Sequence, residues 1–160
     1  MDLRKAESAL LVVFGASGDL AKRKLIPALY ALYEQGLLPP NFVVLGYART
    51  DYTDEEFRRL AYEGIREYSS EDVDDKKWQT FASLLYYQAG SYDSRESFET
   101  LSARVDELDH QHDTKNNHLF YLSTPPTVFE PITTLLSETG MAKEKGDGWT
   151  RVIIEKPFGH

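Results

Sequence analysis

An apolar run near the N-terminus leads through a glycine turn into a helical pattern. The run covers residues 10–14, the turn reads Gly-Ala-Ser-Gly-Asp, and the helical pattern covers residues 20–33. Such a turn lets a phosphate approach the main chain, because glycine carries no Cβ that would block it. The free N–H groups and the dipole at the start of the helix attract an anion to the same place. The segment therefore predicts a strand–turn–helix unit that binds the phosphates of a nucleotide.

Apolar runs and helical patterns alternate five times along the chain. The expected strands cover residues 10–14, 42–46, 84–88, 118–123 and 151–155, and the expected helices cover residues 20–33, 54–68, 75–85, 97–108 and 128–137. This order indicates an α/β fold, and runs that are apolar throughout fit strands with both faces buried. Because crossovers between parallel strands are right-handed, we expect a doubly wound, Rossmann-like, mostly parallel sheet with helices on both faces. Pro27 lies inside the first helix, which we expect to kink there.

The size, charge and composition of the chain limit its function. Its 160 residues are enough for one hydrophobic core, so we expect residues 1–160 to form a single dinucleotide-binding domain. The formal net charge of −8 argues against nucleic acid as a partner. The absence of cysteine excludes thiolate metal sites and cysteine nucleophiles. The apolar run at residues 9–14 is too short for a signal peptide or a membrane span, so we expect a cytoplasmic protein without a membrane partner.

The residues of the glycine turn have separate expected roles. Ser17 offers a hydroxyl group, and Gly18, Asp19 and Leu20 offer main-chain N–H groups to a phosphate. The Asp19 side chain is expected to cap the helix. Lys22 and the two basic residues after it add local positive charge, although a solvated helix face explains the latter two equally well. The alternative for the whole segment is an ordinary strand-to-helix turn.

Arg49 follows the second expected strand, where dinucleotide-binding folds hold the ribose of the coenzyme. An acidic residue at this place typically binds the 2′-hydroxyl group of NAD, whereas an arginine suits the 2′-phosphate of NADP. Arg49 therefore favours NADP as the cofactor. Asp51 lies close by and weakens this prediction, and a solvated loop arginine is the alternative.

Lys156 follows the last expected strand, where open α/β sheets place their ligands. Its amino group can hold a substrate beside a cofactor, but a structural lysine fits the spacing equally well. Pro157 forces a turn after it, and a cis peptide bond is one option there. The histidines within residues 110–113 are typical of a surface loop rather than a metal site, and we expect no metal. His160 is adjacent to this motif, but as the terminal residue it is a weak candidate for a base.

Five segments together resemble the N-terminal coenzyme domain of the glucose-6-phosphate dehydrogenase family. They are Phe-Gly-Ala-Ser-Gly-Asp-Leu-Ala at residues 14–21, Gly-Tyr-Ala-Arg at 46–49, Ala-Gly-Ser-Tyr-Asp at 89–93, Leu-Phe-Tyr-Leu-Ser-Thr-Pro-Pro-Thr-Val-Phe at 119–129 and Glu-Lys-Pro-Phe-Gly at 155–159. The first and the last are the most specific. The resemblance implies an oxidoreductase that transfers a hydride from C1 of glucose 6-phosphate to NADP and forms 6-phosphogluconolactone, the entry step of the pentose phosphate pathway. It also implies that the parent enzyme is a homo-oligomer.

The resemblance also assigns residues of this chain to the coenzyme. The implied coenzyme-binding residues are Gly15, Ala16, Ser17, Gly18, Asp19, Leu20, Ala21, Lys22, Arg49, Ser91, Tyr92, Pro126, Phe129 and Lys156. Ser91 and Tyr92 would lie on the adenine side, and Pro126 and Phe129 on the nicotinamide side. Some family members carry tyrosine where Phe129 stands, so a hydroxyl contact is lost here. Lys156 is the implied catalytic residue, because it would position the sugar and the nicotinamide together.

One part of the family pattern is missing from this chain. Family members are much longer and place their catalytic histidine in an Arg-Ile-Asp-His-Tyr-Leu-Gly-Lys-type motif, which does not occur here. Oxidation of the C1 hydroxyl group needs a base, so we expect a truncated part of the enzyme that is inactive by itself. A stand-alone nucleotide-binding sensor or scaffold is the alternative. An acyl-phosphate aldehyde dehydrogenase also uses glycine turns, but its chemistry usually needs the thiolate that this chain lacks.

Overall fold

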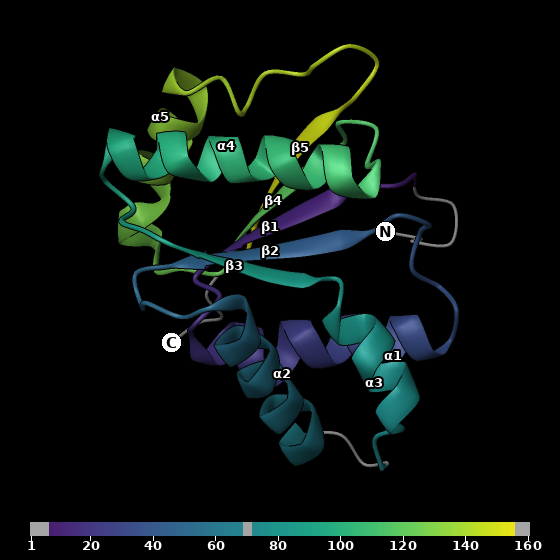
Figure 1. Ribbon diagram of the computed structural model, residues 1–160. Coiled ribbons are helices and arrows are strands. Elements are labelled where there is room, and N and C mark those ends of the chain that lie inside the picture. The colour runs from purple at the N-terminus through teal and green to yellow at the C-terminus, as the bar shows by residue number, and fades with distance from the viewer. Residues whose placement is uncertain (1–6, 69–71, 156–160) are drawn as a thin grey trace.

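The protein contains a five-stranded parallel sheet with helices on both faces (Figure 1). The computed structural model describes residues 7–68 and 72–155. The strands are β1 (Leu10–Phe14), β2 (Val43–Ala48), β3 (Leu85–Ala89), β4 (His118–Leu122) and β5 (Thr150–Ile154). The helices are η2 (Ala21–Leu25), α1 (Ile26–Glu34), α2 (Asp54–Tyr68), α3 (Asp75–Ala82), α4 (Arg95–His112), η3 (Pro126–Val128) and α5 (Phe129–Glu138). The strand order is β3-β2-β1-β4-β5, so the expected α/β, Rossmann-like class is confirmed.

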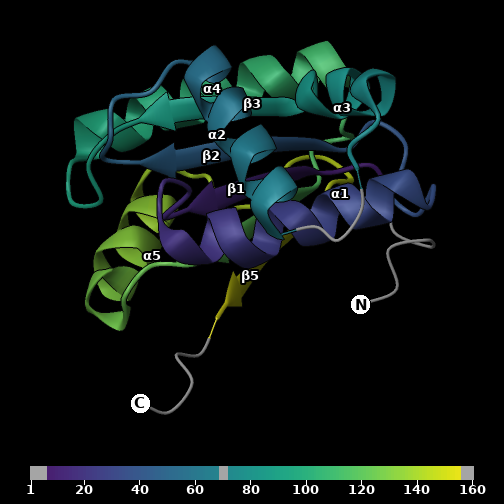
Figure 2. The ribbon, with the colours of Figure 1, turned by 90° about the horizontal axis from the view of Figure 1, so that it is seen from below.

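Alternate residues of the central strands supply two separate hydrophobic cores. Leu11 and Val13 of β1 pack with residues of α1, α2 and α3, whereas Leu10, Val12 and Phe14 pack with residues of α4 and α5. Figure 1 shows the first three helices below the sheet and the other two above it, and Figure 2 shows the same layers from below. Every residue of β1 and β2 is buried, as expected for strands covered on both faces. No helix in the described ranges is long and apolar enough to cross a membrane.

The carboxyl ends of three strands meet at the glycine turn. In the register of the sheet, Phe14 lies opposite Tyr47 of β2 on one side and Leu122 of β4 on the other. The strand order reverses between β1 and β4, and this is the position where open α/β sheets hold their ligands. The loops that follow β1, β2, β3 and β4 therefore converge at the carboxyl end of the sheet.

The distortion expected at Pro27 takes the form of a π turn. The helical segment begins beside the glycine turn, and the N–H group of Ile26 donates to the carbonyl of Ala21, five residues earlier. Proline has no N–H group, and its ring crowds the carbonyl four residues before it. The wider π turn relieves this crowding within η2, and α1 then continues regularly to Glu34.

The fourth helix is longer than the sequence pattern predicts, and the surface loop expected for the histidines within residues 110–113 is therefore wrong. His110 and His112 lie on α4, which ends at Asp113 in the left-handed conformation (φ 51°). Asp109 is buried and binds His118, with 2.6 Å between Oδ2 and Nε2, and it accepts a hydrogen bond from the Thr114 hydroxyl group. This cluster fixes the amino end of β4, at the opposite edge of the sheet from the glycine turn. The expected third helix also ends early, because it gives way to β3.

Candidate coenzyme site

Gly15 opens the turn after β1 in a conformation that favours glycine. Its φ angle is +85°, and a Cβ there would lie 3.0 Å from the carbonyl oxygen of Ser123 and from the Cγ2 atom of Thr124. The Ser123 hydroxyl group donates to the carbonyl of Phe14 over 2.7 Å, which holds the end of β4 against this turn. The tight approach of the two segments therefore explains why a side chain is missing at this position.

The main-chain N–H groups of the turn fall into two sets. Gly15 and Ala16 donate to the carbonyl of Tyr47 over 2.9 and 3.4 Å, and Gly18 donates to the carbonyl of Gly15 over 2.9 Å. The expectation that Gly18 offers its N–H group to a phosphate is therefore wrong. Within the described residues, no main-chain carbonyl accepts from Ser17, Asp19 or Leu20. These three groups at the start of the helical segment can bind an anion.

Asp19 does not cap the helix as expected. Its carboxylate binds the guanidinium group of Arg23 over 3.0 Å, one helical turn away, and both side chains are exposed. This ion pair takes up the charge of Arg23 on the solvated face. Lys22 instead lies at the cavity beside the turn, so the first two cations of the basic run have different environments.

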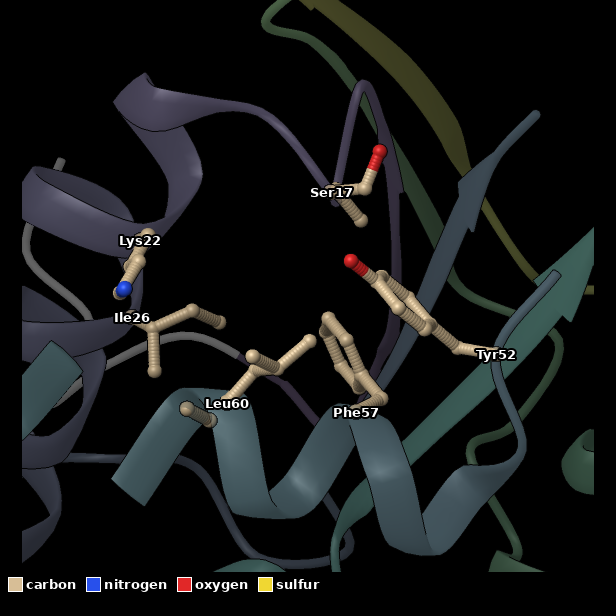
Figure 3. Close-up of a pocket in the computed structure, with 8 residues that line it drawn as sticks. Ser17, Lys22, Ile26, Tyr52, Phe57 and Leu60 are labelled. Carbon is tan, nitrogen blue, oxygen red and sulfur yellow. The ribbon is translucent and has the colours of Figure 1, made fainter. Parts of the chain in front are cut away.

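A cavity of about 150 Å³ lies between the glycine turn, η2 and α2. Figure 3 shows the hydroxyl group of Tyr52 directed toward Ser17, with Lys22 on the opposite side. The residues that line the cavity are Ala16, Ser17, Lys22, Ile26, Tyr52, Phe57, Leu60 and Ala61. Its walls are mainly apolar, and its polar atoms belong to the turn and to residues close to it. The cavity therefore adjoins the residues that are expected to hold phosphates.

Arg49 and Tyr92 come together from the loops after β2 and β3. The guanidinium carbon of Arg49 lies 5.8 Å from the centre of the Tyr92 ring, within range of a cation–π interaction. Burial raises the pKa of Tyr92, while a hydrogen bond with the main chain of Gly15 and the charge of Arg49 oppose that shift. Arg49 and Tyr92 therefore lie against each other at the carboxyl end of the sheet.

Ser91 forms hydrogen bonds with other residues of the protein. Its hydroxyl group donates to the carboxylate of Asp93, and its carbonyl accepts from the Tyr47 hydroxyl group over 2.6 Å. The sequence motif identified Ser91, but it did not reveal these contacts. Ser91 therefore shapes the loop on which Tyr92 stands.

On the other side of the turn, Pro126 and Phe129 follow β4. Pro126 is exposed at the start of η3, and Phe129 packs partly against the core beneath α4 and α5. Burial, and next the neighbouring Glu155, raise the pKa of Tyr121, whose hydroxyl group donates to that carboxylate over 2.6 Å. Lys156, Pro157 and His160 lie outside the described residues. Among the residues that are described, no cluster of three potential metal ligands occurs, including around His110 and His112.

Two threonines, Thr50 and Thr124, also belong to the site, although the sequence analysis assigned them no role. The Oγ1 atom of Thr50 lies 3.3 Å from the Oγ atom of Ser17, so the loop after β2 touches the glycine turn. Thr124, whose methyl group limits the space at Gly15, has a buried hydroxyl group with no hydrogen-bond partner in the described part of the chain. The available signals were that Thr50 directly follows the motif at residues 46–49 and that Thr124 lies within the motif at residues 119–129.

Comparisons with known proteins agree with this architecture. Residues 12–160 match the family model "Glucose-6-phosphate dehydrogenase, NAD binding domain". The chain is 38% identical over 150 residues to glucose-6-phosphate 1-dehydrogenase 2 of Mycobacterium tuberculosis, a match that covers 94% of this chain and 29% of the relative. The corresponding protein of Aggregatibacter actinomycetemcomitans is 44% identical over 156 residues, which are 98% of this chain and 31% of that protein. A chloroplastic relative from Nicotiana tabacum is 41% identical over 99% of this chain and 26% of its own length.

Solved structures are similar as well. A glucose-6-phosphate dehydrogenase in complex with its substrate glucose 6-phosphate matches the whole chain with a TM-score of 0.80 and 36% identity. The enzyme from Mycobacterium avium matches 96% of the chain with a TM-score of 0.79 and 31% identity. The chain covers 32% and 31% of these two structures, so it spans about a third of the proteins that it resembles.

Proposed function

Because the chain belongs to the glucose-6-phosphate dehydrogenase family and contains its dinucleotide-binding domain, we propose that it binds NADP for the oxidation of glucose 6-phosphate. The parent enzyme would oxidise glucose 6-phosphate at C1 to 6-phosphogluconolactone, which is the entry step of the pentose phosphate pathway. One observation carries the proposal: the loops that bear Arg49 and Tyr92 meet at the carboxyl end of the sheet, where Thr50, next to Arg49, touches Ser17 of the glycine turn. The sequence alone placed them in separate segments.

The glycine turn would hold the diphosphate of the coenzyme. The N–H groups of Ser17, Asp19 and Leu20 are available at the start of the helical segment, and a Cβ at Gly15 would crowd the turn. Lys22 adds a positive charge beside it. Gly18, Ala16 and Ala21 would contribute shape rather than donors. The donor set and the shape of the turn both fit a diphosphate.

Arg49 would select NADP over NAD. Its exposed guanidinium group can bind a 2′-phosphate through two parallel hydrogen bonds and can lie against the adenine. Tyr92 supports it from the loop after β3, next to Ser91.

The loop after β4 would receive the nicotinamide, which accepts the hydride when the coenzyme is bound. Pro126 and Phe129 stand at the start of η3 and α5, on the β4 side of the turn. Phe129 presents an apolar ring and supplies no hydroxyl donor there. Lys156 follows β5 in the sequence and would bind the sugar phosphate substrate and position it against the nicotinamide. Its own position lies outside the described residues.

The parent enzyme would be longer than this chain. The chain spans about a third of its relatives, so we propose that residues 1–160 are the coenzyme domain of a homo-oligomeric enzyme, and that the general base and sugar site lie elsewhere. A similar solved structure contains glucose 6-phosphate, which supports this substrate for the parent. We expect the parent enzyme in the cytoplasm. The relative from Nicotiana tabacum is named chloroplastic, so a localisation experiment should compare these two compartments.

Calorimetric titration of this chain with NADP and with NAD tests the cofactor directly. We expect tighter binding of NADP, and we expect Arg49→Ala to weaken NADP binding roughly 10- to 100-fold, because charge-assisted hydrogen bonds to the phosphate are lost. NAD binding should change little. Arg151→Ala is a matched control, since Arg151 lies against Trp149 on β5, away from the turn. An NADP-to-NAD ratio that survives the loss of Arg49 would contradict the assignment.

A further inference from the structure

We propose that Tyr47 is a positioning residue that sets the selectivity of the site for the 2′-phosphate, by holding the loop after β3 against Arg49. The inference rests on the proposed function, because it concerns how the same site tells NADP from NAD. Tyr47 would act from beneath the site, through its contacts with Ser91 and Tyr92, rather than by touching the coenzyme.

Tyr47 joins two loops of the site at once. It is fully buried near the end of β2, opposite Phe14 in the sheet. Its carbonyl accepts the N–H groups of Gly15 and Ala16, and its hydroxyl group donates to the carbonyl of Ser91 over 2.6 Å. The main chain of Tyr47 therefore anchors the glycine turn, while its side chain anchors the loop after β3.

The ring of Tyr47 extends this link to Arg49. The centres of the Tyr47 and Tyr92 rings are 6.0 Å apart, and the Arg49 guanidinium group lies against Tyr92. Phe14 and Phe98 pack edge-on against Tyr47, each with ring centres 5.5 Å away, and fix its orientation. Two direct contacts thus connect the buried ring of Tyr47 to the exposed cation of Arg49.

Gly90 makes the approach of the loop possible. A Cβ on Gly90 would lie 2.7 Å from the Cζ atom of Tyr47, closer than real side chains approach. The N–H group of Gly90 donates to the carbonyl of Ala48 over 2.9 Å, so the backbone is held at this distance. The absence of a side chain at Gly90 and the hydroxyl group of Tyr47 therefore serve the same contact.

The Tyr47 hydroxyl group remains a donor across the ordinary pH range. Burial raises the pKa of Tyr47, and a hydrogen bond with Ser97 opposes that shift only in part. Phenylalanine at this position would keep the packing with Phe14 and Phe98 but would remove the only described side-chain donor to the Ser91 carbonyl. The loop would then be free to move away from Arg49.

The test compares Tyr47→Phe with Tyr86→Phe in calorimetric titrations of this chain. Tyr86 is a suitable control, because its hydroxyl group binds His112 at the carboxyl end of α4 rather than a residue of the loop after β3. We expect Tyr47→Phe to weaken NADP binding roughly tenfold and NAD binding by less than about twofold, as expected for a lost hydrogen bond that acts on the phosphate contact. Tyr86→Phe should leave both affinities unchanged. Equal losses for NADP and NAD would indicate a merely structural role and would overturn the inference.

A double-mutant cycle shows whether Tyr47 acts through Arg49. If it does, Tyr47→Phe should have almost no further effect on NADP binding in the Arg49→Ala background. Additive effects would overturn the positioning role while leaving the proposed function intact. The proposed function itself fails if Arg49→Ala leaves the ratio of NADP to NAD affinity unchanged.

Gly90→Ala provides a second approach if Tyr47→Phe does not fold. The new methyl group pushes the loop away from Tyr47 without altering the tyrosine. The same selective loss of NADP affinity is expected, together with the same dependence on Arg49. Unchanged NADP affinity in a folded Gly90→Ala protein would contradict the inference.

Discussion

The two edge strands of the sheet, β3 and β5, differ in whether side chains cover their outer main-chain groups. Side chains from the neighbouring helices occupy the outer edge of β3: the N–H group of Tyr87 donates to Asp54 and the carbonyl of Leu85 accepts from Arg58, both over 2.8 Å. On β5, no side chain of the described residues binds the outer main chain, and Val152 and Ile154 are 42% and 47% exposed. Figure 2 shows the two strands at opposite sides of the sheet.

A partly buried tyrosine ring, that of Tyr86, completes the closed edge at β3. The Tyr86 ring lies within 5.1 Å of the Arg58 guanidinium group and 5.7 Å of the Arg104 guanidinium group. Arg104 also binds Asp54 over 2.9 Å, which links α4 to α2 around the edge. Closed edges cannot pair with another strand, whereas open apolar edges invite it. The difference indicates that, among the described residues, β5 is the edge of the sheet that can pair with another strand.

The largest expected effect concerns catalysis by this chain. We expect this chain to produce no detectable NADPH with glucose 6-phosphate, because no general base is identifiable in its sequence. NADPH fluorescence measures the turnover, and NADP binding by the same sample shows that the domain is folded. Turnover by pure 160-residue protein would contradict this expectation and would show that the chain itself supplies a general base.

The closed edge can be broken at one carboxylate. Asp54→Ala removes the acceptor of the Tyr87 N–H group and the partner of Arg104, both partly buried, so we expect a loss of about 2 kcal/mol in the free energy of unfolding. Urea unfolding measures it. Asp106→Ala is the control, because its ion pair with Lys145 is exposed and should cost less than about 0.5 kcal/mol. Equal losses in the two variants would mean that Asp54 does not secure the edge.

The open edge can be blocked by a charge. We expect the wild-type chain to self-associate through β5, and Val152→Lys to weaken that association about fivefold through lost apolar burial. Sedimentation over a range of concentrations measures both. Thr80→Lys, an exposed change on α3, should have no effect. A wild-type chain that stays monomeric at every concentration would show that β5 is not an adhesive edge.

The smallest expected effect is a pH dependence within the closed edge. Burial lowers the pKa of His112 below its ordinary value of 6.5, and its Nε2 atom lies 2.8 Å from the Tyr86 hydroxyl group. The folded protein therefore favours neutral His112. The stabilising contribution of neutral His112 to the free energy of unfolding is complete above pH 6.5 and is lost as the pH falls through the lowered pKa. The free energy of unfolding of the wild type should be lower at about pH 5.5 than at about pH 7.5. In His112→Gln this decrease should be smaller, by under about 1 kcal/mol. Equal losses would contradict it.

The sequence predicted the parts of the fold that repeat a pattern. The strand runs were confirmed to within two residues at each end. Helix α2 matches its expected bounds, because Thr53 and Glu56 form a capping box at its start. The π turn was not predictable in form, because it depends on how Pro27 meets the carbonyls before it. The buried pair of Asp109 and His118 was not predicted: His118 begins an expected strand, but Asp109 lies beyond the expected end of the fourth helix, because polar residues give no apolar signal.

The candidate site was predictable in its members but not in its contacts. The glycine turn and Arg49 were found from their positions after strands, whereas Gly18 and Asp19 use their expected donor and cap groups within the protein. Tyr47 was missed, because a tyrosine within an apolar strand looks like core. Only the packing of three loops at one edge reveals its hydrogen bond to Ser91.

The most direct test of the account is a crystal structure of this chain with NADP. The account predicts that the diphosphate accepts hydrogen bonds from the main-chain N–H groups of Ser17, Asp19 and Leu20, with the 2′-phosphate at Arg49. A coenzyme bound away from the glycine turn, or a turn closed by its own side chains at saturating NADP, would contradict it.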